Sequence, residues 1–116
     1  MKVTDLGKTS RIKVEMEGAE KAWKQLVLSS SDGAPNFSFR VFTVEPGGHT
    51  PLHTHESEHL NYIIQGEGAL VDSEGTERRI AAGNFALVLP GEKHQYRNTG
   101  SSEDLILICA VPSQYE

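Results

Sequence analysis

The sequence predicts an all-β domain, built as a sandwich or a barrel, and three observations lead to this fold class. Short segments with strand-like patterning recur along the chain, turn-forming residues separate them roughly every eight to twelve residues, and no segment has convincing helical periodicity. The 116 residues are enough for one hydrophobic core and too few for a second domain. We therefore expect residues 1–116 to form a single domain.

Three predicted strands precede a histidine-rich segment. Residues 11–17 alternate apolar and charged side chains, which predicts a strand with one buried apolar face. A second apolar stretch covers residues 23–28 and ends in a cluster of turn-forming residues at 29–33. Residues 36–45 give the clearest early strand, because apolar side chains occupy both parities and several of them are aromatic.

The strands predicted after the histidine-rich segment are short, and glycine or proline punctuates the turns between them. The last of these strands is the most apolar. We expect these strands over residues 60–65, 69–72, 76–80, 85–89, 94–97 and 104–111.

Composition and charge argue against several classes of protein. The net charge is −5, from 16 acidic and 11 basic residues, and the basic residues are scattered, which argues against nucleic-acid binding. The longest apolar run, Leu105–Val111, is far shorter than the roughly twenty residues of a membrane span. The N-terminus lacks the apolar segment of a signal peptide, so we expect a cytoplasmic protein. The single cysteine, Cys109, excludes an intramolecular disulfide and a cysteine cage within one chain.

Four of the five histidines lie within residues 49–59, and this clustering predicts a metal site. His53 and His55 stand two apart in a segment that a proline keeps from being helical, so they project from one face of an extended chain. His59 has the same parity. His94 can join them from a neighbouring strand of a small barrel.

The alternative is that these histidines are unrelated surface or core residues. A lone histidine usually is one or the other, and two histidines separated by one residue are a weak signal of metal binding. Compatible parity among four of them, beside glycines that let strand ends bend, favours the metal site. Glu56 and Glu58 have the opposite parity and are expected to face solvent. No spacing argument includes His49, which we expect at the rim or on the surface.

Two spaced motifs resemble those of the cupin family. The first consists of Gly47, five residues, His53-Thr54-His55, three residues, His59, six residues and Gly66. The second consists of Gly83, five residues, Leu89-Pro90-Gly91, two residues, His94, three residues and Asn98. The resemblance extends over residues 37–111, which is most of the chain.

The chain departs from the family pattern at two positions. Leu89 stands where a proline is usual, with Pro90 displaced by one position, and the turn is retained. His59 stands where the family usually has a glutamate that binds the metal. An imidazole in place of this carboxylate makes all four ligands neutral, so that a divalent ion keeps its full charge and its reduced state is favoured.

The resemblance implies a single jelly-roll β-barrel whose core spans residues 37–111. Residues 1–35 are then N-terminal strands that contact the partner in a homodimer. The resemblance also implies a metal site like that of small manganese-binding cupins with four histidines. Its ligands are His53, His55, His59 and His94.

Manganese or iron is favoured at this site, while zinc, nickel and copper also suit imidazole ligands. Four ligands in an octahedral field leave two adjacent positions open for water, oxygen or a bidentate substrate. The leading function is a metal-dependent oxidoreductase, similar to a dioxygenase, that acts on a small organic substrate. The alternatives are a non-catalytic module that binds or senses a small ligand, and a sugar isomerase or epimerase.

Two further side chains are candidates to lie near the metal. Cys109 shares its parity with the apolar residues of the last strand, so it is either a small buried hydrophobe or a thiol that lines the barrel. Arg40 either extends to solvent or points into the cavity mouth to bind an anionic substrate. The aromatic residues Tyr62, Tyr96 and Trp23 are interpreted as core residues without a functional role.

Overall fold

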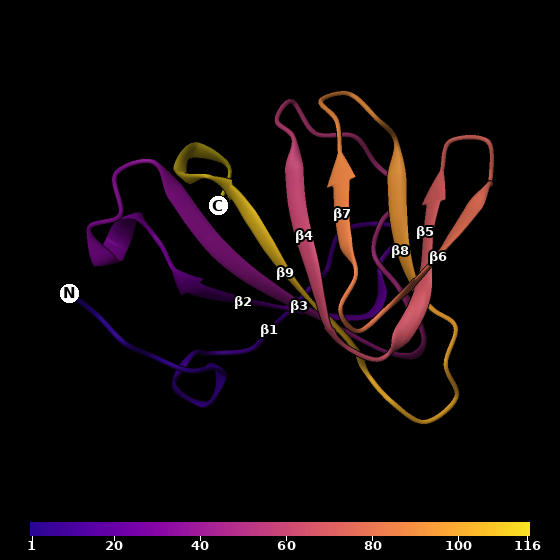
Figure 1. Cartoon of the computed structure of the whole chain (residues 1–116), viewed down its shortest axis with the longest axis horizontal. Helices are drawn as coiled ribbons and strands as arrows, with labels where there is room; N and C mark the ends of the chain where they lie inside the picture. The colour runs from indigo at the N-terminus through magenta and orange to yellow at the C-terminus, as the bar shows by residue number, and fades with distance from the viewer.

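Antiparallel strands form one strongly curled sheet in the computed structural model, which describes residues 1–116 (Figure 1). The strands are β1 (Ile12–Lys13), β2 (Glu20–Leu28), β3 (Phe37–His49), β4 (His59–Gln65), β5 (Glu67–Asp72), β6 (Glu77–Ala81), β7 (Phe85–Val88), β8 (His94–Asn98) and β9 (Leu105–Pro112). The helices are single 3-10 turns, η1 (Leu6–Lys8), η2 (Ser30–Asp32) and η3 (Ser113–Tyr115). None of them has the length or the apolar character needed to span a bilayer. This architecture confirms the predicted all-β jelly-roll barrel.

Strand β3 joins the two walls of the barrel. Most of it pairs with β2 on one side and β9 on the other, whereas its last residue, His49, pairs with Arg97 of β8. The first wall consists of β2, β3, β9, β4 and β7. The second wall consists of the end of β3 with β8, β5 and β6. The strand bends at Gly47, whose φ is +81°, and at Gly48, where a Cβ would lie 2.6 Å from the carbonyl oxygen of Glu20.

The interior of the barrel is partly filled by an apolar core and partly hollow. In β9 each fully buried side chain alternates with a half-buried one, as expected for a strand with one face in the core. Toward the histidine segment the interior holds the cavity that is described below. The core cluster consists of Ala22, Val44, Ile63, Ile80, Tyr96, Leu105 and Leu107.

The N-terminal half differs from the sequence-based expectation in three places, and one of them is that β2 begins at Glu20, three residues before the expected stretch 23–28. The strand expected over residues 11–17 is only β1, which pairs with β2 of the same chain. Val14 and Met16 line the cavity instead, so the alternation marks a segment with one apolar face rather than a long strand. Conversely, β3 continues past residue 45, because the two glycines let it bend without ending. The contact of residues 1–35 with a partner stays a prediction.

The strands after the histidine segment agree with the sequence. Each of them begins and ends within about two residues of its predicted range. The agreement follows from the turn glycines, of which Gly66, Gly75, Gly83 and Gly91 have positive φ angles.

Candidate metal centre

The backbones of His53 and His94 hold the histidine segment against β8. The His53 amide donates to the His94 carbonyl at 3.1 Å, and the His94 amide donates to the His53 carbonyl at 3.0 Å. Two residues that exchange both hydrogen bonds in an antiparallel pair have their side chains on the same face. The imidazoles from two distant parts of the sequence therefore point into the barrel together, with ring centroids 5.6 Å apart.

His55 is held by the turn that follows β7. The amide of Gly91 donates to the His55 carbonyl oxygen at 2.9 Å, and Gly91 has a φ of +80° that favours glycine in this turn. The ring of His55 lies 4.2 Å from that of His53 and 5.2 Å from that of His94, measured between centroids. One ring nitrogen from each of these three histidines lies within 4.8 Å of the others, so the three form a cluster that could hold a metal ion.

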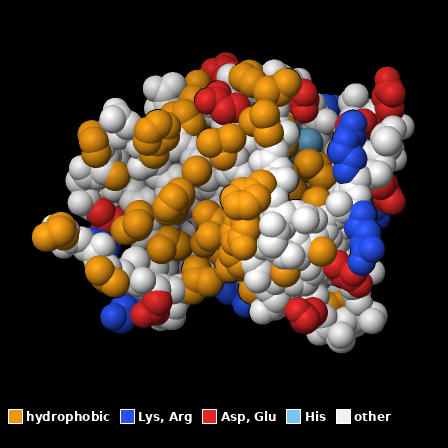
Figure 2. Space-filling view, viewed as in Figure 1, with side chains coloured by type: hydrophobic (Ala, Val, Ile, Leu, Met, Phe, Trp, Pro, Cys, Tyr) orange, Lys and Arg blue, Asp and Glu red, His pale blue; other side chains and the backbone are white.

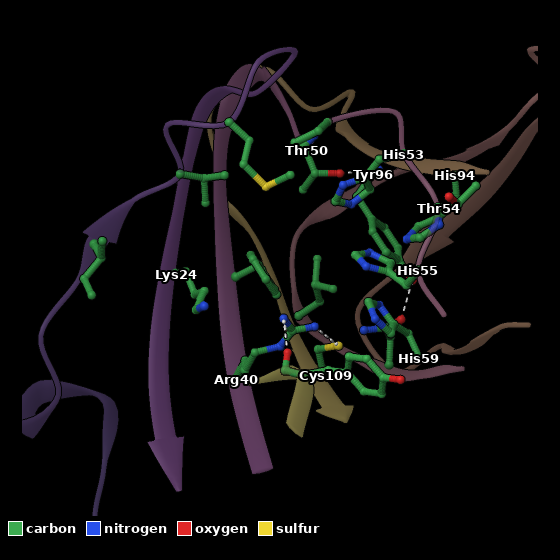
Figure 3. A pocket seen from close by; sticks show the side chains of 18 of the residues that line it. Lys24, Arg40, Thr50, His53, Thr54, His55, His59, His94, Tyr96 and Cys109 are labelled. Atoms are coloured by element: carbon green, nitrogen blue, oxygen red, sulfur yellow. Dashed lines mark hydrogen bonds between the residues drawn. The ribbon is translucent and has the colours of Figure 1, made fainter. Parts of the chain in front are cut away.

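His59 lies against this cluster as a fourth imidazole. It begins β4, is buried, and has its ring centroid 3.9 Å from that of His55 and 5.7 Å from that of His94. The group of ring nitrogens within 4.8 Å of one another contains His53, His55 and His94 and does not contain His59. All four imidazoles line the cavity and lie close together in Figure 3. Metal binding by all four stays a prediction.

The remaining residues of the histidine segment lie where the sequence analysis expected them. Glu56 and Glu58 are exposed. His49 is half-buried at the end of β3, does not line the cavity, and has its Nδ1 3.2 Å from Gln95 Nε2.

The donor chemistry of the cluster fits a divalent metal of the first transition row. His94 Nδ1 lies 3.1 Å from the Glu92 carbonyl oxygen, which can only accept, so Nδ1 carries the proton and Nε2 keeps its lone pair for a metal. Burial, with smaller contributions from neighbouring imidazoles and Arg40, lowers the pKa of His55 to about 4 and that of His59 to about 3. Burial also lowers the pKa values of His53 and His94. Neutral imidazoles are the form that binds metal.

The cluster opens into a cavity of about 520 Å³. Arg40, Cys109 and Asn61 form a row across β3, β9 and β4 on the inner face of the sheet, and all three line the cavity. Arg40 is buried rather than extended to solvent, and Cys109 is both buried and part of the lining. Figure 3 shows Arg40 beside Cys109, to which it is hydrogen-bonded. The structure thus places Arg40 in the cavity rather than in solvent, whereas Cys109 combines the two positions that the sequence left open.

Three other polar residues of the cavity had no role in the sequence analysis. Tyr96 was interpreted as a core residue, and it is one, but it also lines the cavity, where its hydroxyl donates to Asn61 Oδ1 at 2.8 Å. Burial raises the pKa of Tyr96, so the hydroxyl stays protonated. Asn61 could have been found, since it follows His59 by two residues and therefore shares its face. Lys24, on β2, gave no signal in the sequence.

The jelly roll and the inward-facing histidine cluster define this chain as a small β-barrel protein with a candidate metal site beside a cavity. Residues 40–111 match the family described as the cupin domain. The chain belongs to the cupin family.

Several solved structures share the fold over most of the chain. The polyketide cyclase RemF from Streptomyces resistomycificus is 27% identical, with a TM-score of 0.89 over 97% of this chain and 80% of RemF. A predicted oxalate decarboxylase from Thermotoga maritima is 28% identical, with a TM-score of 0.78 over 96% of this chain and 99% of its own. A cupin 2 domain-containing protein from Halorhodospira halophila is 30% identical, with a TM-score of 0.73 over 87% of this chain and 68% of its own. No curated protein matches significantly in sequence.

The lowered pKa values predict that the metal-free protein loses stability as the pH falls below 6.5. Between pH 6.5 and about 4, the unfolded chain binds protons on histidines that stay neutral in the folded protein, so unfolding takes up protons. The free energy of unfolding should fall with decreasing pH, by as much as about 1.4 kcal/mol per pH unit for each imidazole that stays neutral. Urea denaturation between pH 7.5 and 5, after dialysis against a chelator, measures this dependence.

His49 supplies the matched control. The H55Q/H59Q double variant should lose much of the pH dependence, whereas H49Q should keep it. A stability of the metal-free protein that is constant from pH 7.5 to 5 contradicts the prediction.

Proposed function

We propose that this cupin is a metal-dependent enzyme of the oxygenase type that acts on a small organic molecule. His53, His55, His59 and His94 would hold the ion, with manganese or iron favoured and zinc, nickel or copper also compatible with imidazole. A manganese or iron ion held by neutral ligands would supply Lewis acidity and redox chemistry toward dioxygen. The observation that carries the proposal is that the imidazole cluster opens directly into a cavity of about 520 Å³, large enough for a small substrate.

The residues around the cluster have separate roles in this proposal. Tyr96 and Asn61 are joined by their hydrogen bond, and Asn61 Nδ2 also donates to the Ile108 carbonyl at 3.2 Å, so the pair is fixed in place. Such a fixed polar pair orients a substrate at low cost in conformational entropy. Apolar lining residues such as Phe42 and Leu107 exclude water from the same space.

A second candidate function is metal-assisted cyclisation or proton transfer without net oxidation. The similarity to the polyketide cyclase RemF, which extends over 97% of this chain, favours it. The same cavity and the same ligands serve this chemistry, with the metal acting only to polarise a substrate oxygen.

Turnover with and without oxygen distinguishes these functions. The protein is loaded with Mn(II) or Fe(II) and incubated with oxygen-bearing chelators such as catechols, 1,3-diketones and short dicarboxylates. The proposal predicts oxygen uptake coupled to substrate loss, and H94Q should reduce the rate by at least about a hundredfold because a ligand is lost. H49Q is the control and should keep the rate of the unmodified protein.

Two results would contradict the oxygenase proposal. Substrate conversion that proceeds equally well without oxygen supports the cyclase-type function instead. A metal-loaded protein that binds ligands from this panel and converts none of them would be a binding module rather than an enzyme.

We also propose that the protein is a homodimer that buries the outer face of the first wall. Cross-strand partners build two rows on this face, one from Phe39, Ala110, Leu60 and Leu87 and the other from Val41, Ile108, Tyr62 and Phe85. Neither row contains a charged residue. Leu60 is 54% exposed and Phe85 is 82% exposed. Figure 2 shows hydrophobic side chains gathered on the face that β9, β4 and β7 cross.

The exposed surface area of the chain, which is larger than expected for a monomer of its mass, supports a second copy of the chain as the partner. The chain exposes 6909 Å², whereas a monomer of 12.7 kDa is expected to expose about 6,200 Å². The excess is close to the roughly 800 Å² that each partner buries in a typical interface. A neutral apolar face suits a copy of itself, since homodimer interfaces have the most apolar cores.

Sedimentation of an interface variant tests the homodimer. The unmodified protein should sediment as a dimer at tens of micromolar, and L60D should sediment as a folded monomer because it places a charge in the centre of the face. L52D, at an exposed leucine outside this face, should stay dimeric. A monomeric unmodified protein, or a dimeric L60D, contradicts this interface.

A further inference from the structure

Arg40 is a buried cation whose hydrogen-bonding capacity is largely unused. It lies on the inner face of β3, lines the cavity and is only 7% exposed. Its Nη2 lies 3.2 Å from Cys109 Sγ, its Nη1 donates to the Tyr115 carbonyl at 3.5 Å, and its Nε has no partner. A guanidinium carries five N–H donors, so these two contacts leave most of its donors free.

No carboxylate neutralises Arg40. The ion pairs of the structure join Lys2 to Asp32, Lys8 to Asp5, Arg78 to Asp72 and Arg79 to Glu67, and none of them lies in the cavity. A buried charge is costly unless it is paired, and natural proteins rarely leave one unpaired without a functional reason.

Lys24 adds a second positive charge on the same side of the cavity. It lies on β2 opposite Phe42 of β3 and also lines the cavity (Figure 3). Burial and the charge of Arg40 lower the pKa of Lys24, as expected for two cations that face each other across little solvent. The side chain of Glu116, which also acts on Lys24, is hydrogen-bonded to Ser30 and Ser38.

The other charges of the cavity do not offset this pair. Lys13 and Glu15 are both exposed on the segment that borders the cavity, and their charges cancel. The four histidines supply no negative charge, because an imidazole is either neutral or cationic. The inner cavity therefore has two cations and no anion. The rest of its lining is largely apolar and includes Ile12, Val14, Met16, Phe42 and Leu107.

We propose that the cavity recognises an organic carboxylate with an apolar body. The carboxylate oxygens accept hydrogen bonds from Arg40, Lys24 supplies the second positive charge, and the apolar body packs against Phe42 and Leu107. Arginine suits this role because its planar donors match the two oxygens of a carboxylate. This inference names the substrate class for the proposed enzyme and so rests on that proposed function.

The imidazoles and the cations line the same cavity, and Figure 3 draws Lys24 and Arg40 to one side of the histidines. His59 and Arg40 lie on strands of the same wall, β4 and β3. A carboxylate held by Arg40 therefore leaves the remainder of the same molecule in the cavity that the imidazoles line. Arg40 is a specificity-determining residue in this arrangement.

A purely structural role for Arg40 makes different predictions. In that case the guanidinium only links β3 to Cys109 and to the C-terminal turn at Tyr115, and no ligand prefers it. Its removal would then change stability without changing which ligands bind.

Binding of benzoate and benzamide to the metal-free protein separates the two roles. The two probes have the same shape and differ in charge, and the experiment needs no metal and no turnover. Calorimetric titration should show benzoate binding at least about tenfold more tightly than benzamide, since hydrogen bonds to charged groups are the stronger ones. The Nε–H resonance of Arg40 in ¹⁵N-edited NMR spectra should shift on addition of benzoate, and its absence from R40M assigns it.

Substitutions complete the experiment. R40M should abolish the preference for benzoate, R40K should keep part of it, and K24M should weaken it. R97M is the matched control, because Arg97 is an exposed arginine on β8 outside the cavity, and it should bind like the unmodified protein. Thermal unfolding shows whether each variant is folded, and if R40M is not, the unmodified protein, R40K and K24M decide the outcome.

The results that overturn the inference are independent of the metal. Equal affinity for both probes, no binding of benzoate to the unmodified protein, or an unchanged preference in a folded R40M each overturns it. Any of these can occur while the four histidines bind metal and the enzyme is active. Conversely, benzoate preference through Arg40 without metal-dependent turnover sustains carboxylate binding and removes only the enzymatic proposal.

Discussion

The pair of backbone hydrogen bonds between His53 and His94 is the contact on which the candidate site depends. These bonds join a segment outside the regular strands to β8 and place two imidazoles side by side on the inner face. The hydrogen bond from Gly91 to the His55 carbonyl places the third. Backbone hydrogen bonds thus bring the imidazoles of His53, His55 and His94 together on one side of the cavity.

The bend in β3 joins the two walls that enclose the cavity. The Pro-Gly-Gly segment lets one strand run from the first wall to the second, and residues of both walls line the cavity. The inner face of β3 then carries Arg40 toward the space that the imidazoles face. The bent strand β3 therefore carries Arg40 and joins the two walls that hold histidines, the first through β4 with His59 and the second through β8 with His94.

The imidazole of His59, in place of a carboxylate, connects the proposed metal site with the proposed binding of a carboxylate by Arg40. A carboxylate in the position of His59 would add a negative charge close to Arg40, since the charge of Arg40 already acts on the His59 imidazole. With histidine there, the positive charge of the cavity stays uncompensated by the protein. In the proposed enzyme, a bound metal ion with its full charge and the buried cations would together attract an anionic substrate.

Sequence reasoning predicted the strands and the inward-facing histidines well because both follow from local rules. Period-two alternation and turn glycines fixed the strands after residue 59, and parity placed the exposed Glu56 and Glu58. The length of β1 was wrong, because a cavity-facing segment has the same alternation as a strand. Lys24 was missed because its position depends on the pairing of β2 with β3, a long-range contact that no local pattern encodes.

The central claim is that all four imidazoles bind one metal ion. Crystals grown from protein loaded with Mn(II), with diffraction recorded so that manganese scatters anomalously, test it most directly. We expect one strong anomalous peak within bonding distance of a nitrogen from each of His53, His55, His59 and His94. A peak bound by three histidines with His59 turned away, or no peak among them, would contradict it.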